Sequence, residues 1–411
     1  MGNRAMKIED ICKVSSSKRI FAREYVETGV PFWRGKEVTE HATGKNDSKG
    51  LFISVRRYNE LKQTGNVPSD DDVLITAVGT IGSIYQIKHE DLPFYFKDGN
   101  IIRLSNWNTE RVNPTYVSLF LRSQIGQQAI KEVEIGSTQK ALTIKDIAKV
   151  PILLPELKTQ NDIAAAIGVI DAKIKINQQI NKNLLKLGIN IAIRTSNINK
   201  STTCRISDMK DFLTVSDHVA NGSFKTLKDN VTIVDKPDYS LFLRNTDLKR
   251  NLMGDKRWIT KHSYDFLKKS HLYGGEVIIS NVGDVGSVHR VPYLDEHMVA
   301  GNNVIFIQSA DSWITDYLYL YFLSNIGQHA LSTITSGSAQ QKFNKTDFRA
   351  IELPIIPKNF VKKNLTPILK KIDSNRVEED CLITLRDLLL PRLLSGEIDL
   401  SILEEVLKNA K

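Results

Sequence analysis

The sequence repeats itself once along the chain, and this duplication limits the possible folds more than any other feature. Six blocks recur in the same order, and the distance between partners changes only from 210 residues (31 to 241) to 201 residues (136 to 337). The pairs are PFWRGKEV (31–38) with LFLRNTDL (241–248), LFISVRRYNEL (51–61) with RWITKHSYDFL (257–267), DVLITAVGTIGSIY (72–85) with EVIISNVGDVGSVH (276–289), KDGNIIRL (97–104) with VAGNNVIFI (299–307), YVSLFLRSQIGQQA (116–129) with YLYLYFLSNIGQHA (317–330), and GSTQKALTIKDIAKVPILLP (136–155) with GSAQQKFNKTDFRAIELPIIP (337–357). The period is too long for a solenoid repeat and indicates a duplicated domain.

Each copy has the local signals of a mixed helix and sheet domain. Short runs such as DVLIT, SIYQI, NIIRLS and NVIFIQ are rich in Ile and Val, which is typical of strands. Asn113 followed by Pro114 predicts a helix N-cap and first helical position. In the second copy, Thr315 and Asp316 are expected to open the matching helix.

A long apolar seam follows each copy. Leucines and isoleucines recur at a spacing of three or four residues, which predicts a long helix that packs against a partner. The seam residues are Ile163, Ile167, Ile170, Ile174, Leu184 and Leu187 after the first copy, and Leu365, Ile368, Ile372, Leu382, Leu385 and Leu389 after the second. Asn177, Asn181 and Asn375 interrupt the seams, and such polar residues often determine register. Pro391 is expected to kink or end the second helix, and Gly396 to stop it.

Two arrangements of these helices are open: each caps its own domain, or the two pair with each other. The second is favoured, because both follow equivalent positions of the duplication. The predicted fold is α+β, with two copies of one duplicated domain, a pair of long antiparallel helices as a coiled-coil-like spacer, and a pseudo-twofold arrangement. The expected segments are a first domain at 1–155, a central helix at 156–200, a second domain at 201–357 and a C-terminal helix at 358–411.

Composition narrows the class of partner. The formal net charge is +9 over 411 residues, which favours a polyanionic partner such as nucleic acid, with a basic surface that is only solvated as the alternative. No stretch is long and apolar enough to cross a membrane, and no signal peptide opens the chain, so a cytoplasmic protein is expected. The three cysteines and eight histidines have no metal-ligand spacing. We therefore expect no metal and no cofactor.

Several motifs together resemble the specificity subunit of Type I restriction–modification systems, over essentially the whole chain. The motifs are KIEDICKV, VGTIGS, VGDVGS, GSTQKALTIKDIAKVPILLP leading into ELKTQ, DHVANGSF, GSAQQKFNKTDF and LRDLLLPRLLSGEIDL. The chain departs from that family's pattern at three places. Gln160 is preceded by Thr159 instead of Glu, the second copy has KNFVKKN without a Gln, and Glu9 occupies the position of the usual opening Gly.

The resemblance implies a non-catalytic DNA reader. Each repeated domain would bind one half of a split double-stranded DNA target, and the helices would space the halves and dock two methyltransferase subunits. Those subunits would hold S-adenosylmethionine and methylate adenine, and ATP-dependent restriction subunits could join them. A seam of about 30 residues spans roughly 45 Å. This suits half-sites that lie one turn of B-DNA apart, about 34–36 Å.

Catalytic alternatives find weak support. NPTY (113–116) resembles an adenine methyltransferase motif but lacks its second Pro. GVPFWRGKE (29–37) does not have the residue spacing of a P-loop, and Glu37 stands at the position where a P-loop has the Ser or Thr that binds magnesium. SDDDV (69–73) offers carboxylates for a metal-dependent nuclease, although a solvated turn before a strand explains them better. A DNA-modifying enzyme with a fused recognition domain remains the main alternative, and an RNA-binding protein with Gly-x-x-Gly clamps ranks last.

Candidate DNA contacts are the cations that differ between the copies, together with two loop positions. Arg34 and Arg244 occur in both copies, so phosphate contact or a structural role suits them better than base recognition. Lys140 and Lys342 lie in the GSTQK and GSAQQK loops, where docking onto the spacer helix competes with DNA contact. The full set is Arg34, Lys36, Lys45, Lys49, Arg56, Arg57, Thr80, Lys140, Arg244, Lys249, Arg250, Lys256, Arg257, Lys261, Lys268, Lys269, Asp284 and Lys342.

The glycine pairs in VGTIGS and VGDVGS are expected to form a tight strand connection or bulge. Strand-like residues follow each pair, and glycine permits a positive φ or a close backbone approach. Thr80 of the first copy is replaced by Asp284 in the second, while both glycines and the serine are kept. This pattern predicts a shared scaffold with a variable tip.

Overall fold

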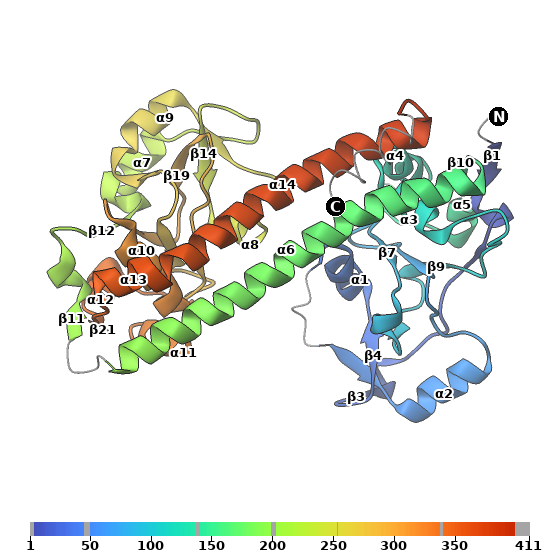
Figure 1. The fold of residues 1–411 in the computed structure, drawn as a ribbon, viewed down its shortest axis with the longest axis horizontal. Helices are drawn as coiled ribbons and strands as arrows, with labels where there is room; N and C mark the ends of the chain where they lie inside the picture. The colour runs from blue at the N-terminus through green and yellow to red at the C-terminus, as the bar shows by residue number, and fades with distance from the viewer. Residues whose placement is uncertain are drawn as a thin grey trace. The chain divides into compact units, whose positions relative to one another are not determined.

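A computed structural model describes residues 4–44, 50–136, 140–198, 203–252, 254–337 and 340–398 (Figure 1). The chain divides into two compact units. Unit 1 comprises residues 1–176 and 379–411, and unit 2 comprises residues 177–378. Each unit therefore holds one copy of the repeat together with part of each long helix.

Unit 1 contains two four-stranded sheets and a two-stranded ribbon. The central sheet has the order β2-β9-β6-β7 and is antiparallel, the second sheet has the order β3-β5-β4-β8 with β4 and β8 parallel, and β1 pairs with β10. The strands are β1 Arg4–Lys7, β2 Lys13–Ser15, β3 Tyr25–Val26, β4 Val30–Trp33, β5 Leu51–Ile53, β6 Val73–Thr76, β7 Ile84–Gln86, β8 Tyr95–Phe96, β9 Ile101–Ser105 and β10 Pro151–Leu154. The helices are α1 Gly35–Ala42, α2 Val55–Gln63, α3 Pro114–Arg122, α4 Gln124–Glu132 and α5 Ile144–Ala148.

Unit 2 repeats this plan. Its central sheet has the order β12-β20-β17-β18, its second sheet β13-β15-β14-β19-β16, and β11 pairs with β21. The strands are β11 Thr203–Arg205, β12 Thr214–Asp217, β13 Ile233–Val234, β14 Ser240–Leu243, β15 Trp258–Ile259, β16 His271–Leu272, β17 Val277–Ser280, β18 Val288–Arg290, β19 His297–Ala300, β20 Val304–Gln308 and β21 Glu352–Pro354. The helices are α7 Phe224–Asn230, α8 Asn245–Lys249, α9 Lys261–Phe266, α10 Ser312–Leu323, α11 Asn325–Thr333, α12 Lys345–Arg349 and α13 Lys358–Asn364. This topology confirms the predicted duplication.

The central strands form because they are buried on both faces. Every residue of β6 and of β17 is buried, since one face meets the second sheet's core and the other meets the helices. Asn113 caps α3 by accepting hydrogen bonds from the amides of Thr115 and Tyr116, as predicted. The expected start of the matching helix is wrong. α10 begins at Ser312 after the N-cap Asp311, so Thr315 and Asp316 lie inside it.

The two long helices are α6, Leu157–Ile198, and α14, Thr366–Ser395. The segment before α14 forms a separate helix, α13, because Pro367 has no amide hydrogen to donate to a carbonyl of the preceding turn. Pro391 lies within α14, so it does not end the helix, and Gly396 follows the last helical residue with φ +76°. Within the described part of the chain, no helix has the length and apolarity to cross a membrane.

The helices pair with each other in antiparallel fashion. In unit 1, Arg386 of α14 forms an ion pair with Asp171 of α6 at 3.1 Å. In unit 2, the Asn177 side-chain amide donates to Glu378 at 2.8 Å, and that of Asn375 donates to Asn181 at 2.8 Å. Residue numbers rise along α6 as they fall along α14. The polar residues that interrupt the seams are therefore matched across the pair, which explains how they can be buried there.

Burial separates the predicted seam positions into two groups. Ile163, Ile167, Ile174, Leu365 and Ile372 are buried, and Ile170, Leu184, Ile368, Leu382 and Leu389 are half-buried. The seam prediction is wrong for Leu187 and Leu385, which are 49% and 46% exposed. Apolar spacing identifies a helix face, but it cannot distinguish the face that meets the other helix from a neighbouring one.

Candidate nucleic-acid interface

The Gly-x-x-Gly stretches form the same tight loop in both units. The loop joins β6 to β7 in unit 1 and β17 to β18 in unit 2. Gly79, Gly82, Gly283 and Gly286 all have φ between +79° and +84°, which confirms the prediction of a glycine-dependent turn. A Cβ at Gly79 or Gly283 would meet nothing within 4 Å, so these glycines are required by backbone conformation and not by crowding.

A glutamine from the following helix pair holds each loop in place. Gln127 of α4 donates from Nε2 to the carbonyl of Gly82 at 3.0 Å and to that of Leu121 at 2.8 Å. Gln328 of α11 makes the same two bonds, to Gly286 at 2.9 Å and to Phe322 at 2.7 Å. The IGQ motif of each copy thus has a structural role that the sequence analysis did not assign. The recurrence of the IGQ motif in both copies is the sequence signal from which this role could have been predicted.

A short hairpin lies against each glycine loop. In unit 1, Ala141 pairs with Ile135 and with Val78 of the loop, and in unit 2, Lys342 pairs with Ser336 and Val282. In unit 2, Gln341 and Lys342 of the GSAQQK segment therefore contact the glycine loop, whereas in unit 1 the contact is made by Ala141, directly after GSTQK. This register also makes Ala141, and not Lys140, the equivalent of Lys342. Because neighbouring residues of an extended segment point to opposite sides, the two lysines are presented differently.

The short helix after β4 or β14 completes the arrangement. In unit 1, Thr39 of α1 donates to Ser83 of the glycine loop at 3.0 Å. In unit 2, Asn245 of α8 donates to Asp284 at the loop tip at 3.1 Å. We call the glycine loop, this helix and the hairpin together the loop surface. It consists of residues 76–83, 35–42 and 135–142 in unit 1, and 280–287, 245–249 and 336–342 in unit 2, where described.

Arg34 and Arg244 are structural residues at the start of these helices. Arg34 donates from Nε and Nη2 to the buried Glu37 at 3.1 and 2.6 Å, and Arg244 does the same to the buried Asp247 at 2.9 and 2.6 Å. Such bidentate pairs orient both partners. The arrangement agrees with the structural role considered for these two arginines, and it explains why Glu37 cannot serve in a P-loop.

The tips of the two loop surfaces differ in charge. The Lys249 ammonium lies 2.6 Å from the Asp284 carboxylate, and this hydrogen bond holds the pKa of Asp284 below its ordinary value. Thr80, at the equivalent tip, is exposed and its carbonyl accepts from the Thr76 hydroxyl. Lys36 and Lys140 are also exposed, and their ammonium groups lie 3.6 Å from Glu40 and 2.8 Å from Glu134. Unit 2 therefore presents an ion pair where unit 1 presents a hydroxyl.

The remaining candidates of unit 1 lie on α2 or outside the described residues. Arg57 forms ion pairs with Glu24 at 3.0 Å and Glu60 at 3.2 Å, and the highly exposed Arg56 lies 3.3 Å from Glu60. Lys45 and Lys49 fall outside the described residues. The structure therefore places Lys36, Thr80 and Lys140 on the loop surface and Arg56 and Arg57 on another helix.

The remaining candidates of unit 2 are spread over several elements. Arg257 pairs with Asp235, and Lys261 of α9 pairs with Asp265 at 3.1 Å and lies 5.2 Å from the Tyr239 ring centroid. Arg250 ends α8, Lys256 is half-buried before β15, and Lys268 and Lys269 are exposed in the 3-10 turn Lys268–Ser270. Only Lys249, Asp284 and Lys342 lie on the loop surface.

The carboxylates before β6 and β17 stabilise turns. Asp72 is buried, accepts from the Ser69 amide at 2.9 Å and lies 3.7 Å from Arg103. The expectation of a solvated turn is therefore wrong at Asp72. Burial raises the pKa of this carboxyl to about 6. No group of residues that could hold a metal ion is found among the residues the structure describes.

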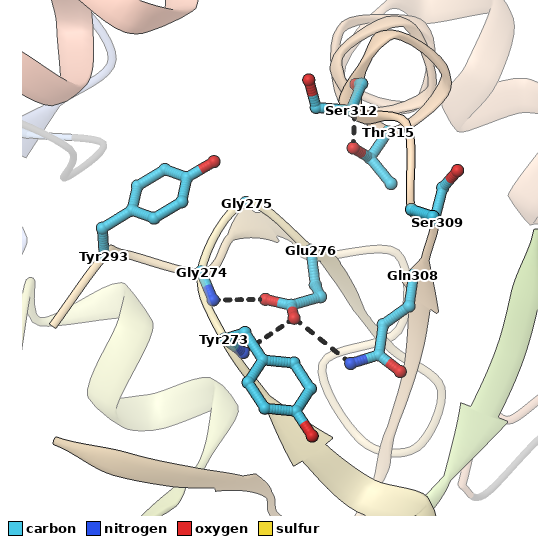
Figure 2. Close-up of a pocket in the computed structure, with 10 residues that line it drawn as sticks. Tyr273, Gly274, Gly275, Glu276, Tyr293, Gln308, Ser309, Ser312 and Thr315 are labelled. Atoms are coloured by element: carbon cyan, nitrogen blue, oxygen red, sulfur yellow. Dashed lines mark hydrogen bonds between the residues drawn. The ribbon is translucent and has the colours of Figure 1, made fainter.

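The equivalent Glu276 lies in the wall of a cavity of about 310 Å³. Figure 2 shows its carboxylate accepting from the amides of Tyr273 and Gly274, each at 2.8 Å, and from Gln308 at 3.2 Å. These three bonds occupy both carboxylate oxygens and brace the turn between Tyr273 and β17. Glu276 is thereby explained as a structural residue.

Each repeat is attached to its long helix by a different polar contact. In unit 1, the fully buried Gln160 of α6 accepts from the Asn113 amide at 2.9 Å and donates to the carbonyls of Arg111 and Pro155 at 3.0 and 2.9 Å. In unit 2, Asp316 of α10 accepts from Thr366 of α14 at 2.7 Å and from Arg290 of β18 at 2.9 Å. Arg290 also pairs with Asp373 of α14. The unit 2 network was not anticipated, since its members are far apart in sequence.

Comparison with known proteins places the chain in a family. The Type I restriction modification DNA specificity domain matches twice, at residues 2–186 and 207–384. A Haemophilus influenzae protein described as a type I restriction enzyme specificity subunit is 30% identical over 164 residues, which is 40% of this chain and 39% of that protein's length. The crystal structure of a Type I restriction–modification S subunit from M. genitalium superposes with a TM-score of 0.52 at 13% identity, over 95% of both chains, and so shares the fold. The two family matches cover most of the chain, which therefore belongs to the Type I restriction–modification DNA specificity family.

Proposed function

We propose that the chain binds a bipartite double-stranded DNA target, with one half-site for each recognition domain. The observation that carries the proposal is the glycine loop of each loop surface, which makes the same backbone turn in both units and has different side chains at its tip. A shared loop with Thr80 and Lys140 on the loop surface of one copy, and Asp284, Lys249 and Lys342 on that of the other, suits two readers of different sequences. Phosphate contacts would come from the lysines, and base contacts from residues at the tip.

The family supplies specificity subunits, which are non-catalytic. The chemistry would therefore belong to partners: two methyltransferase subunits that hold S-adenosylmethionine and, where present, ATP-dependent restriction subunits. The complex would act in the cytoplasm, where its DNA lies. In this assignment, residues 1–155 and 201–357 are the recognition domains, and residues 156–200 and 358–411 are the helical segments.

The long helices would dock the methyltransferase subunits. Val169, Ile176, Ile180 and Leu187 of α6 are exposed, and their spacing of seven, four and seven residues places them on one face of that helix. Val377, Leu385 and Leu388 of α14 are also exposed. Exposed apolar residues in such rows are typical of protein interfaces. Docking of a methyltransferase subunit would also explain why Leu187 and Leu385 are apolar although they are not buried between the two long helices.

The test is to express the chain with its methyltransferase partner and to map methyladenine in host DNA. We expect a split motif with a gap of constant length, methylated only when the chain is present. Replacing residues 201–357 with the matching domain of another specificity subunit should change one half of the motif and leave the other intact. A continuous motif, or methylation without the chain, would contradict the proposal. Binding should also weaken steeply with salt, because phosphate contacts release counterions.

A further inference from the structure

An exposed phenylalanine with a neighbouring cation follows the first strand of the central sheet in both units. In unit 1, Phe21 lies between β2 and β3, and the guanidinium groups of Arg19 and Arg23 lie 5.4 and 5.3 Å from its ring centroid. In unit 2, Phe224 begins α7 between β12 and β13 and is 82% exposed, next to Lys225. Neither phenylalanine is part of the loop surface.

In both units this connection lies beside candidate cations that the loop surface leaves out. Glu24, three residues after Phe21, is paired with Arg57 of α2 at 3.0 Å. In unit 2, Asn221 accepts from the Lys269 amide at 2.9 Å and donates to Ser270 at 2.6 Å, so the segment before Phe224 is joined to Lys268–Ser270. Arg57 therefore contacts the segment that follows Phe21, and Lys268–Ser270 contacts the segment that precedes Phe224.

In unit 1 this segment borders the loop surface through a shared turn. The Gly99 amide donates to Ser16 at 3.2 Å, and the Ala77 amide donates to the Asn100 carbonyl at 2.8 Å. The turn at 97–100 therefore contacts both the segment leading to Phe21 and the start of the glycine loop. A molecule bound to the loop surface can reach the segment around Phe21 across this turn.

We propose that Phe21 and Phe224 are DNA-contacting residues, each placing its ring against the bases or sugars of the half-site bound by its own unit while the neighbouring cations hold the phosphates. The inference rests on the proposed function and adds a second contact element to each recognition domain. DNA fits this surface better than a protein does, since the cations beside each ring complement a polyanion, and cations beside an apolar wedge such as Phe are common in proteins that deform DNA.

The test uses the full chain and a short duplex that carries the methylated motif, with 2-aminopurine placed in one half-site at a time. We expect Phe21→Ala and Phe224→Ala each to lower affinity about tenfold, the scale of one lost base–aromatic contact. Each variant should also reduce the fluorescence rise of 2-aminopurine in one half-site only. Phe212→Ala is the matched control, because Phe212 is similarly exposed (48%) but is followed by no cation and preceded by Asp211.

Several outcomes would overturn the inference. One is wild-type affinity in both alanine variants while the unaltered chain still prefers the motif over a scrambled duplex. Another is normal DNA binding by these variants with loss of assembly with the methyltransferase subunits, which would make the rings a protein-docking surface. If the unaltered chain itself shows no preference for the motif, the proposed function fails as well. Both rings are at the surface, so unchanged thermal unfolding of the variants verifies folding.

Discussion

The two units share a backbone plan but stabilise it with different polar groups at one equivalent position, which is half-buried in unit 1 and buried in unit 2. In unit 1, Gln86 at the end of β7 donates to Thr115 at 3.0 Å. In unit 2, the residue with the same register is Arg290, which forms ion pairs with Asp316, the counterpart of Thr115, and with Asp373 of α14. A neutral hydrogen bond in one copy is thus a buried charge network in the other.

This difference shows that the two copies have kept the same backbone geometry more strictly than the same polar side chains. The turn of the glycine loop, the glutamine that holds it and the tyrosine that follows Thr115 or Asp316 are the same in both units. Tyr116 and Tyr317 even donate to equivalent carbonyls, those of Leu153 and Pro354, each at 2.8 Å. Attachment of the recognition domain to its helix is free to change, provided that every buried polar group finds a partner.

The largest expected effect comes from removing one member of the charge network. Asp316→Ala leaves Arg290 buried with Asp373 as its remaining carboxylate, and we expect unit 2 to lose about 3 kcal/mol of unfolding free energy. Thr115→Ala, the matched change in unit 1, should cost about 1 kcal/mol. Urea denaturation followed by hydrogen exchange assigns each loss to its unit. Equal losses would remove the distinction between the two attachments.

Stability of the two units should respond to pH in opposite directions between pH 4 and about 6. Burial raises the pKa of Asp72 from 3.8 to about 6, so folded unit 1 retains a proton that the unfolded chain has lost, and its stability falls as pH rises through this window. Burial lowers the pKa of His289 from 6.5 to about 4, so the unfolded chain binds a proton first, and unit 2 loses stability as pH falls. Each effect is at most about 3 kcal/mol.

The variants Asp72→Asn and His289→Gln serve as controls for the pH prediction. Each should flatten the dependence of its own unit and leave that of the other unit unchanged. Hydrogen exchange at several pH values reports both units in one sample. A parallel response of the two units in the unaltered chain would show that other groups dominate their titration.

The shared glutamines should give equal and smaller effects. Gln127→Ala and Gln328→Ala each remove two hydrogen bonds to loop and helix carbonyls, so we expect about 1–2 kcal/mol from either change. Faster hydrogen exchange of the glycine-loop amides in the altered unit measures the loss of restraint. A large effect in one unit alone would mean that the loops are held by different contacts after all.

The smallest effect is expected from surface ion pairs. Lys358 and Lys362 of α13 lie 2.5 and 3.1 Å from Asp311, and all three side chains are substantially solvent-accessible. Removing either lysine should change the stability of unit 2 by about 0.5 kcal/mol or less, because solvent screens exposed pairs. A loss as large as that of Asp316→Ala would place the attachment of the helix at this surface and not in the buried network.

The sequence by itself determined the duplication, the central strands, the helix cap at Asn113, the positive φ of the paired glycines and the family. These are local or repeated signals, so pattern and spacing are sufficient to detect them. Only the tertiary structure decided that Lys140 and Lys342 are not equivalent, that Leu187 and Leu385 face solvent, and that Arg290 meets Asp316 and Asp373. These facts depend on which residues distant in sequence come to lie within a few ångströms, and burial then decides whether their charges must be paired.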